Sequence, residues 1–134
     1  MAKKIAIWGG TFLVAVLASL TPSDSRVEAQ SADVSRAIDH AADTYGLSRR
    51  FMWCLALRES TYRPWVTSAQ GDGGLYQFKA GTFASHAPRF GFAGASRYDA
   101  WAAAHVAAGV ISTQPVATTN QMWPPSRWCG NPWW

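Results

Sequence analysis

Charge is scarce in this chain of 134 residues: charged side chains make up 15% of it, and lysine occurs only three times. Low charge combined with 13% aromatic residues excludes an intrinsically disordered chain, which needs high net charge and few aromatics. No run of lysine and arginine follows the start of the chain, so a basic arm for nucleic acid is also excluded. The length allows one domain of ordinary size and argues against two.

Long apolar runs are also rare, and the one that stands out is at the N-terminus. Lys3 and Lys4 precede a mostly apolar run over residues 5–20, and residues 21–29 form a short polar segment that ends on a small residue, Ala29. A basic start, an apolar stretch and a small residue at the end are typical of a secretory signal peptide.

An uncleaved membrane anchor is the alternative for this run. A spanning helix needs about 20 apolar residues, and Gly9 and Gly10 weaken the run further. We therefore expect a signal peptide over residues 1–29 and one domain over residues 30–134. That domain is expected to lie outside the cytoplasm (periplasm or cell wall), with no stable membrane insertion after cleavage.

Cysteine occurs only twice, as Cys54 and Cys129. Two cysteines are too few for a secreted inhibitor-like domain built on disulfides. In an oxidising compartment a disulfide between them is the default expectation, and two separate buried thiols are the alternative. Such a bridge ties the end of the chain to its middle.

Helical signals dominate the exported part. Ser31 is a candidate N-cap for a helix that Gly46 ends, and Ser48 is a candidate N-cap for a second helix ending near Ser60. Residues 51–57 of that second helix are apolar on every face, which is typical of a buried central helix.

The rest of the chain is expected to hold a short helix over residues 81–86 and an alanine-rich helix from Asp99 to about Ile111. The proline-rich tail after Thr113 is expected to wrap around the domain without forming a helix. Strands are nearly absent from these signals, so the predicted fold class is all-α.

Glutamate is the rarest acid, and Glu59 is the only one within residues 30–134. It continues the inward-facing stripe of Leu55 and Ala56, and it lies in the last turn of its helix. Apolar surroundings and the helix dipole both raise the pKa of a carboxyl there, as a general acid requires. The alternative is a helix-end glutamate paired with an arginine, for which three candidates lie nearby: Arg49, Arg58 and Arg63.

Several short motifs follow in a fixed order: Glu59-Ser60-x-Tyr62-Arg63-Pro64, Ser68-Ala69-x-Gly71, Gly74-Leu75-Tyr76-Gln77-Phe78 and Thr82. In this order the chain resembles the soluble lytic transglycosylases of the lysozyme-like superfamily, over residues 45–112. A second likeness is to resuscitation-promoting factors, which place a cysteine shortly before the catalytic glutamate and end on Trp-Pro and a closing cysteine. Here these are Cys54, Trp123-Pro124 and Cys129.

The resemblance implies a lysozyme-like domain that cleaves the β-1,4 bond between N-acetylmuramic acid and N-acetylglucosamine in peptidoglycan strands. Glu59 matches the single catalytic acid/base, and the expected product is a 1,6-anhydro end. Ser60 matches the residue that orients the glutamate, and Gln77 matches a residue lining the cleft beside it. Tyr62 and Tyr76 are expected to contact substrate, although Tyr76 could equally be a core aromatic.

Two other functions stay open at this stage: a hydrolytic muramidase like the resuscitation-promoting factors, and a wall-binding domain with weak activity. Asp72, in a glycine-rich turn, is the candidate second carboxylate that hydrolysis requires. His86 and His105 have no partner at metal-ligand spacing, so no metal and no cofactor is expected. Trp101 is expected in the core, Trp133 and Trp134 are either a wall-binding platform or packed, and the enzyme is expected to be a monomer.

Overall fold

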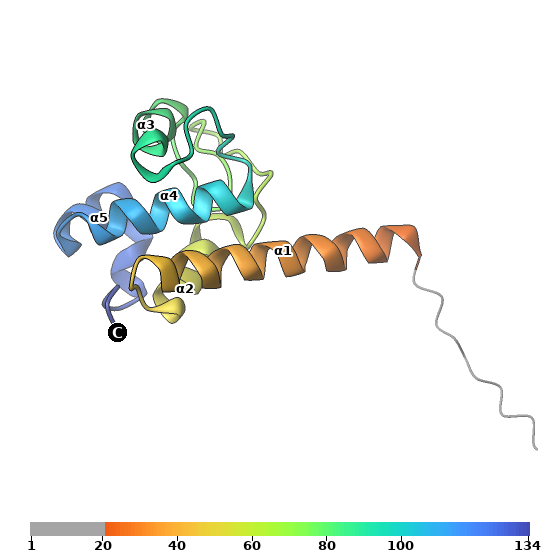
Figure 1. Ribbon diagram of the computed structural model, residues 1–134, viewed down its shortest axis with the longest axis horizontal. Helices are drawn as coiled ribbons and strands as arrows, with labels where there is room; N and C mark the ends of the chain where they lie inside the picture. Colours follow the sequence, from red (N-terminus) through yellow and green to blue (C-terminus); the bar gives the residue numbers. More distant parts are fainter. Residues whose placement is uncertain (1–20) are drawn as a thin grey trace, which may run out of the picture.

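The structure, a computed structural model, describes residues 21–134 as one small helical domain with a long helix leading into it (Figure 1). In chain order, the α-helices and 3₁₀ helices are α1 (Pro22–Thr44), α2 (Arg49–Ser60), α3 (Ala80–His86), η1 (Ala87–Phe90), α4 (Ala100–Ser112), α5 (Val116–Met122) and η2 (Pro124–Trp128). The apolar run over residues 5–20 lies outside the described residues. In the described part of the chain, no helix is long and apolar enough to cross a membrane.

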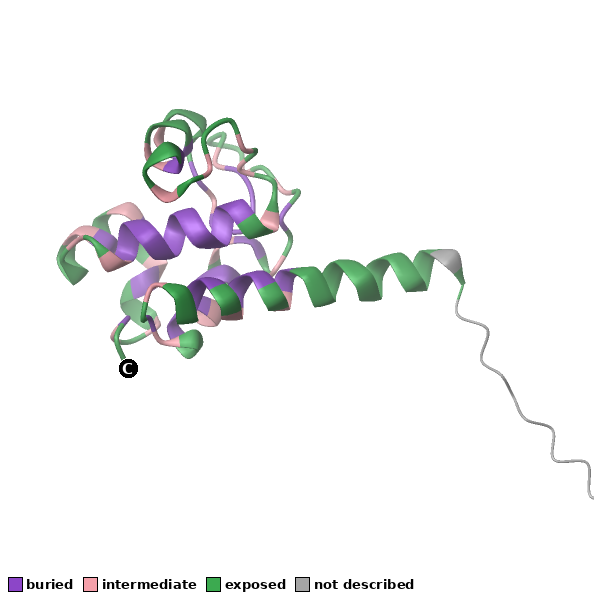
Figure 2. Cartoon of the chain, viewed as in Figure 1, coloured by how far each residue is buried: buried purple, intermediate pink, exposed green. Residues whose placement is uncertain are grey.

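Helix α1 starts earlier than the sequence predicted. Thr21 caps it, because its side chain accepts a hydrogen bond from the backbone N–H of Asp24, and the Asp24 side chain accepts one from the backbone N–H of Thr21. Ser31 therefore lies inside the helix, and the prediction of an N-cap there is wrong. Residues 23–33 of α1 are exposed, and burial begins at Val34 (Figure 2). Gly46 follows the helix with a left-handed φ of +66°, as expected.

Helices α2 and α4 provide much of the core. Ser48 caps α2 by accepting a hydrogen bond from the Phe51 N–H, and Asp99 caps α4 in the same way, so both predicted starts are confirmed. Burial on every face holds only in part for α2, because Leu57 is 46% exposed. The helix that is buried almost all round is α4, where residues 102–111 are all buried (Figure 2).

The segment between α2 and α3 contains the little strand pairing that residues 21–134 show. Gly73 forms isolated antiparallel bridges with Thr67 and with Phe78. At Gly74 φ is +83°, and a Cβ there would lie 2.0 Å from the Arg97 carbonyl oxygen. Only glycine fits that position. The fold class is therefore all-α with minimal strand, as the sequence predicted.

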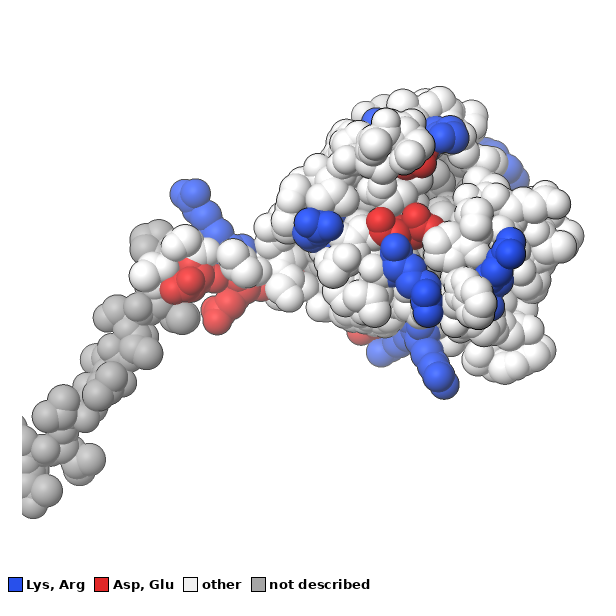
Figure 3. All heavy atoms as spheres, turned by 180° about the vertical axis from the view of Figure 1, so that it is seen from behind, with Lys and Arg blue, Asp and Glu red and all other residues white. Residues whose placement is uncertain are grey.

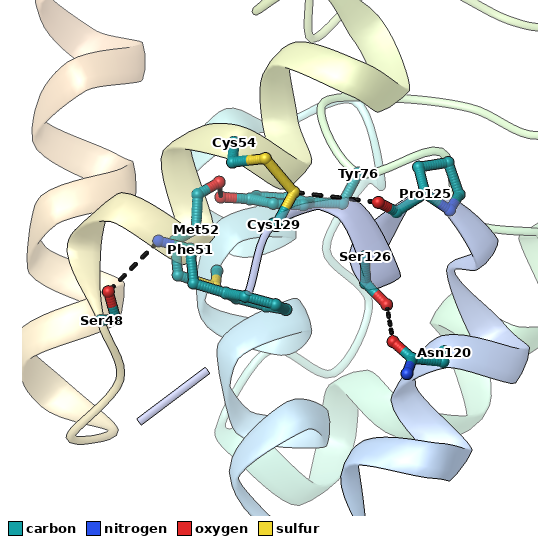
Figure 4. Close-up of a disulfide and its surroundings, with 9 residues drawn as sticks. All are labelled: Ser48, Phe51, Met52, Cys54, Tyr76, Asn120, Pro125, Ser126 and Cys129. Atoms are coloured by element: carbon teal, nitrogen blue, oxygen red, sulfur yellow. Dashed lines mark hydrogen bonds between the residues drawn. A yellow bond between two sulfur atoms is a disulfide. The ribbon is translucent and has the colours of Figure 1, made fainter. Parts of the chain in front are cut away.

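The C-terminal tail departs from its prediction, because α5 forms between Pro115 and Pro124. Pro115 is the N-cap, a position that needs no donated hydrogen bond, and residues 116–122 contain no proline. The predicted disulfide is confirmed: Cys54 of α2 is bonded to Cys129, just after η2, with a Cα–Cα distance of 5.5 Å (Figure 4). The tail is thereby fastened to α2.

Candidate active site

A cleft of about 320 Å³ opens where the end of α2 meets the tail. It is lined by residues from α2, from the loop before α3, from α3 and from the α5–η2 segment: Glu59, Asp72, Gln77, Phe78, Lys79, Thr82, Gln121, Met122, Trp123, Pro124 and Pro125. Seen from the side opposite to Figure 1, the surface has acidic side chains in a hollow and basic side chains near them (Figure 3). The carboxyl of Glu59, at the end of α2, is therefore surrounded by both polar and apolar side chains.

Glu59 is half-buried in this cleft, and its pKa is raised from 4.5 to about 7. Burial of the carboxyl is the main cause, and the negative charge of Asp72 is the second. The sequence predicted that the pKa of Glu59 is raised and that burial is one cause. It named the helix dipole as the second cause, where the structure has the charge of Asp72. A carboxyl with a pKa near 7 can hold a proton and release it in the same pH range, as acid/base catalysis requires.

The alternative of a structural ion pair does not apply to Glu59. Among residues 21–134, its carboxyl has no ion pair and no side-chain hydrogen bond. Arg49 instead pairs with Asp43, to which its Nε donates at 2.8 Å, and the Nε of Arg63 donates to the Ser60 carbonyl at 3.0 Å. The Glu59 carboxyl is therefore free to meet a ligand.

Ser60 does not bond to Glu59, although the resemblance implied that it orients the glutamate. It is buried, and its hydroxyl donates to the Leu75 carbonyl at 2.8 Å and to the Ala56 carbonyl at 3.2 Å. The bond to Leu75 joins the end of α2 to the Gly74–Phe78 loop, and the bond to Ala56 lies within α2. Ser60 thus acts on the shape of the cleft through the loop.

Tyr76 is a core residue, so the expectation that it contacts substrate is wrong. Its side chain is fully buried, and its hydroxyl donates to the Met52 carbonyl at 3.1 Å (Figure 4). Its own carbonyl accepts a hydrogen bond from the Trp123 indole N–H at 2.8 Å. Tyr76 supports the cleft from behind, because it connects α2 to the tail.

Gln77, the next residue, lies in the cleft with Glu59. Its backbone has a left-handed φ of +50°, which turns the chain so that Tyr76 points inward and Gln77 toward the cleft. The side-chain amide donates to the carbonyls of Gly74, at 2.9 Å, and Val66, at 3.2 Å. Gln77 is therefore held in place, and its other amide atom is left to contact a ligand.

Tyr62, which was expected to contact substrate, does not line the cleft that holds Glu59. It packs edge-on against Trp53, with ring centroids 5.3 Å apart, and lines a separate cavity of about 260 Å³ with Trp65 and the middle of α1. Glu59 does not line that cavity. We therefore do not include Tyr62 in the site.

Asp72 does reach the cleft, and it is paired with Lys79, whose Nζ lies 2.9 Å from its carboxyl. The pair places a second carboxylate in the same cleft as Glu59. Lys79, Gln121 and Pro125 were not singled out by the sequence, because they belong to segments that only the folded chain brings to α2. The one available signal was Cys129, since a bridge to Cys54 brings the preceding residues to the helix that ends in Glu59.

The other tryptophans and the histidines that the sequence singled out lie outside the cleft of Glu59. Trp101 is 39% exposed, so its expected place in the core is wrong; it stacks on His40 and His105 and lines a cavity of about 520 Å³. Trp133 and Trp134 are both exposed. His105 is bonded to His40 at 2.9 Å, and within residues 21–134 no group of histidine, cysteine and acidic residues is arranged to hold a metal ion.

Residues 36–125, more than half of the chain, match the family model described as the transglycosylase SLT domain. The chain belongs to this family. Both the half-buried Glu59 and the loop that carries Gln77 fall within the matched residues. No curated protein and no solved structure is similar enough to the chain to count as a match. Membership makes this SLT domain an enzyme of the cell wall that cleaves glycosidic bonds in peptidoglycan, which accords with action outside the cytoplasm.

Proposed function

We propose that this SLT domain is a lytic transglycosylase that uses Glu59 as its only acid/base. The observation that carries the proposal is the half-buried Glu59 carboxyl, with its pKa near 7 and no protein partner, in a cleft of the described domain. A wall-binding domain without activity has no need of such a carboxyl, because burial of an ionisable group lowers stability.

The reaction has two steps. The protonated Glu59 donates its proton to the glycosidic oxygen as the bond between that oxygen and C1 of N-acetylmuramic acid breaks. The Glu59 carboxylate then accepts the proton of the C6 hydroxyl of the same sugar, whose oxygen bonds to C1. The product is a 1,6-anhydro ring, no water is consumed, and the carboxyl ends as it began.

Gln77 lies beside Glu59, and we propose that it binds the sugar at the cleavage point. Ser60 is a positioning residue that holds the loop of Gln77 against α2 through the Leu75 carbonyl. Neither Tyr62 nor Tyr76 takes part in this site.

Hydrolysis is the second candidate, and one observation favours it: Asp72 lines the same cleft. Glycosidases that use water generally need two carboxylates. Against this role, Lys79 lies 2.9 Å from one oxygen of the Asp72 carboxyl, and the positive charge of the lysine makes that carboxylate a weaker base toward water.

Mass analysis of digested peptidoglycan separates the two. Transglycosylation gives ends lighter by one water than the reducing ends of hydrolysis. We expect anhydro ends, no cleavage by Glu59→Gln, and a loss of less than about tenfold for Asp72→Asn, well below the 10²–10⁴-fold of a lost acid/base. Reducing ends, with both variants inactive, would establish hydrolysis instead.

We also propose that residues 1–29 are a signal peptide and that residues 30–134 act as a monomer outside the cytoplasm. Packing of α1 begins at Val34, and residues 23–29 of that helix are exposed, so cleavage after Ala29 takes none of their side chains out of the core. N-terminal sequencing of the exported protein should begin at Gln30, and light scattering should give the monomer mass.

A further inference from the structure

A second cavity of about 540 Å³ adjoins the cleft, because Pro124 and Pro125 line both. The other residues that line the second cavity are Arg58, Arg127 and Trp128. Arg58 directly precedes Glu59 in α2, yet Glu59 lines the cleft and Arg58 lines the second cavity. The two cavities are therefore neighbours that share the proline pair as a common wall.

The two arginines have no acidic partner of their own. Within residues 21–134, the arginines in ion pairs are Arg36 and Arg49, and neither Arg58 nor Arg127 makes an ion pair or a side-chain hydrogen bond. Trp128 beside them is 71% exposed. Guanidinium groups match the planar shape of a carboxylate and bind it with two parallel hydrogen bonds. Two guanidiniums and an indole in one cavity thus suit a carboxylate with an apolar or sugar-like neighbour.

The wall that carries Arg127 and Trp128 is firmly held. Cys129, the next residue, is bonded to Cys54 of α2. The buried Ser126 donates its hydroxyl proton to Asn120 of α5 (Figure 4). The family match ends at residue 125, so Arg127 and Trp128 follow it. The cavity is therefore built partly from the matched SLT domain, through Arg58 and the two prolines, and partly from residues that follow it.

We propose that this cavity binds a carboxylate of the substrate and so selects the strands that the enzyme cleaves. The inference rests on the proposed function, because it takes peptidoglycan as the ligand. The sugar rings of peptidoglycan are neutral. Its carboxylates are on the peptides attached to the muramic acid, or on the lactyl group once a peptide has been removed. The shared chemistry is a carboxylate near the cleaved bond.

The test measures binding by calorimetry to the Glu59→Gln protein, which keeps each ligand intact. Three probes distinguish the sources: an oligomer of N-acetylglucosamine without carboxylates, a glycan fragment stripped by an amidase, and the same fragment with its peptides. We expect at least one carboxylate-bearing probe to bind about tenfold more tightly than the neutral oligomer, the effect of one good charge-assisted contact. The probe that does so identifies the source.

Adding Arg58→Gln and Arg127→Gln should remove that tenfold preference and leave binding of the neutral oligomer within about twofold, which also shows that the cleft is intact. Arg50→Gln is the matched control, because Arg50 is an exposed arginine of α2 that lines neither cavity. Equal affinity for all three probes, or a preference that survives in the double variant, overturns the proposal. Failure of the proposed function looks different, because the protein with Glu59 intact would then cleave nothing, or leave reducing ends, while the binding preference remained.

Discussion

Replacing Glu59 by glutamine should make the protein inactive and more stable at the same time. The amide is nearly isosteric with the carboxyl, so packing at the end of α2 is retained, but it cannot give a proton to the glycosidic oxygen. Loss of an acid/base lowers the rate by about 10²–10⁴-fold. Because protonation matters only as the bond breaks, the loss should lie in kcat with little change in KM.

The gain in stability follows from the pKa of Glu59. Its value of about 7 in the folded protein, against 4.5 ordinarily, bounds the cost of the charged form at about 3 kcal/mol, since each pH unit corresponds to about 1.4 kcal/mol. Water still reaches this half-buried carboxyl, and screening reduces the expected effect to about 1–2 kcal/mol.

The stability gained by Glu59→Gln should depend on pH. The unfolded chain releases the proton near pH 4.5, but the folded chain does so only near pH 7. The wild-type protein therefore loses stability relative to Glu59→Gln as the pH rises through this window, and the difference is complete above it. Below pH 4.5 both side chains are neutral, and the two proteins should be equally stable.

Urea denaturation at about pH 4 and about pH 8 measures the difference in stability between the wild-type protein and Glu59→Gln, with the disulfide intact in both. Asp43→Asn is the control of opposite sign, because the hydrogen bond from Arg49 lowers the pKa of Asp43; this variant should be the less stable one at neutral pH. If Glu59→Gln gains nothing at pH 8, or gains as much at pH 4, the reasoning about the buried carboxyl is wrong. An active Glu59→Gln protein would refute its catalytic role.

Three further predictions concern the disulfide, two glycines and the buried His105. Replacing Cys54 and Cys129 by serine should lower the free energy of unfolding by up to about 4 kcal/mol, because the bridge closes a long loop; urea titration measures the loss, and an unchanged midpoint would contradict it. Gly74→Ala should fail to fold stably, since its Cβ would meet backbone, whereas Gly81→Ala in α3 should be neutral or gain about 0.5–1 kcal/mol; equal thermal midpoints would contradict the pair. Burial lowers the pKa of His105 below 6.5, so the unfolded chain takes up a proton at a higher pH than the folded chain does. The free energy of unfolding should therefore fall as the pH drops below 6.5. In a Glu59→Gln background, adding His105→Gln should make the free energy of unfolding depend less on pH in this range.

Local signals in the sequence were enough to predict the helices near the site. Ser48 and Asp99 cap their helices through hydrogen bonds to residues three positions ahead, and Gly46 ends α1 with a positive φ. Each of these interactions involves only a few neighbouring residues, so the sequence is sufficient to predict it. Where local signals competed, the prediction was wrong: Ser31 could cap a helix, but Thr21 with Pro22 and Asp24 starts it earlier.

The position of Glu59 and the direction of its pKa change also followed from the sequence, because the apolar stripe of α2 includes it. Asp72, which adds to that pKa change, reaches the cleft only through the turn of the folded loop. Tyr76 and Gln77 are neighbours in the chain, yet one is in the core and the other in the cleft. The choice between them depends on a positive φ at Gln77 and on the space beneath α2, which no local pattern contains.

The cysteine pair predicted that the tail is fastened to α2, but the tertiary structure decided which residues of the tail form the far wall of the cleft. The α5–η2 segment lies far from Glu59 in sequence, and it reaches α2 because Cys129 is bonded to Cys54 and the Trp123 indole donates to the Tyr76 carbonyl. Periodicity and caps report contacts within a few residues, whereas a cleft depends on which distant surfaces bury one another. The sequence by itself thus determined the helices and the acid, and only the folded chain determined what faces that acid.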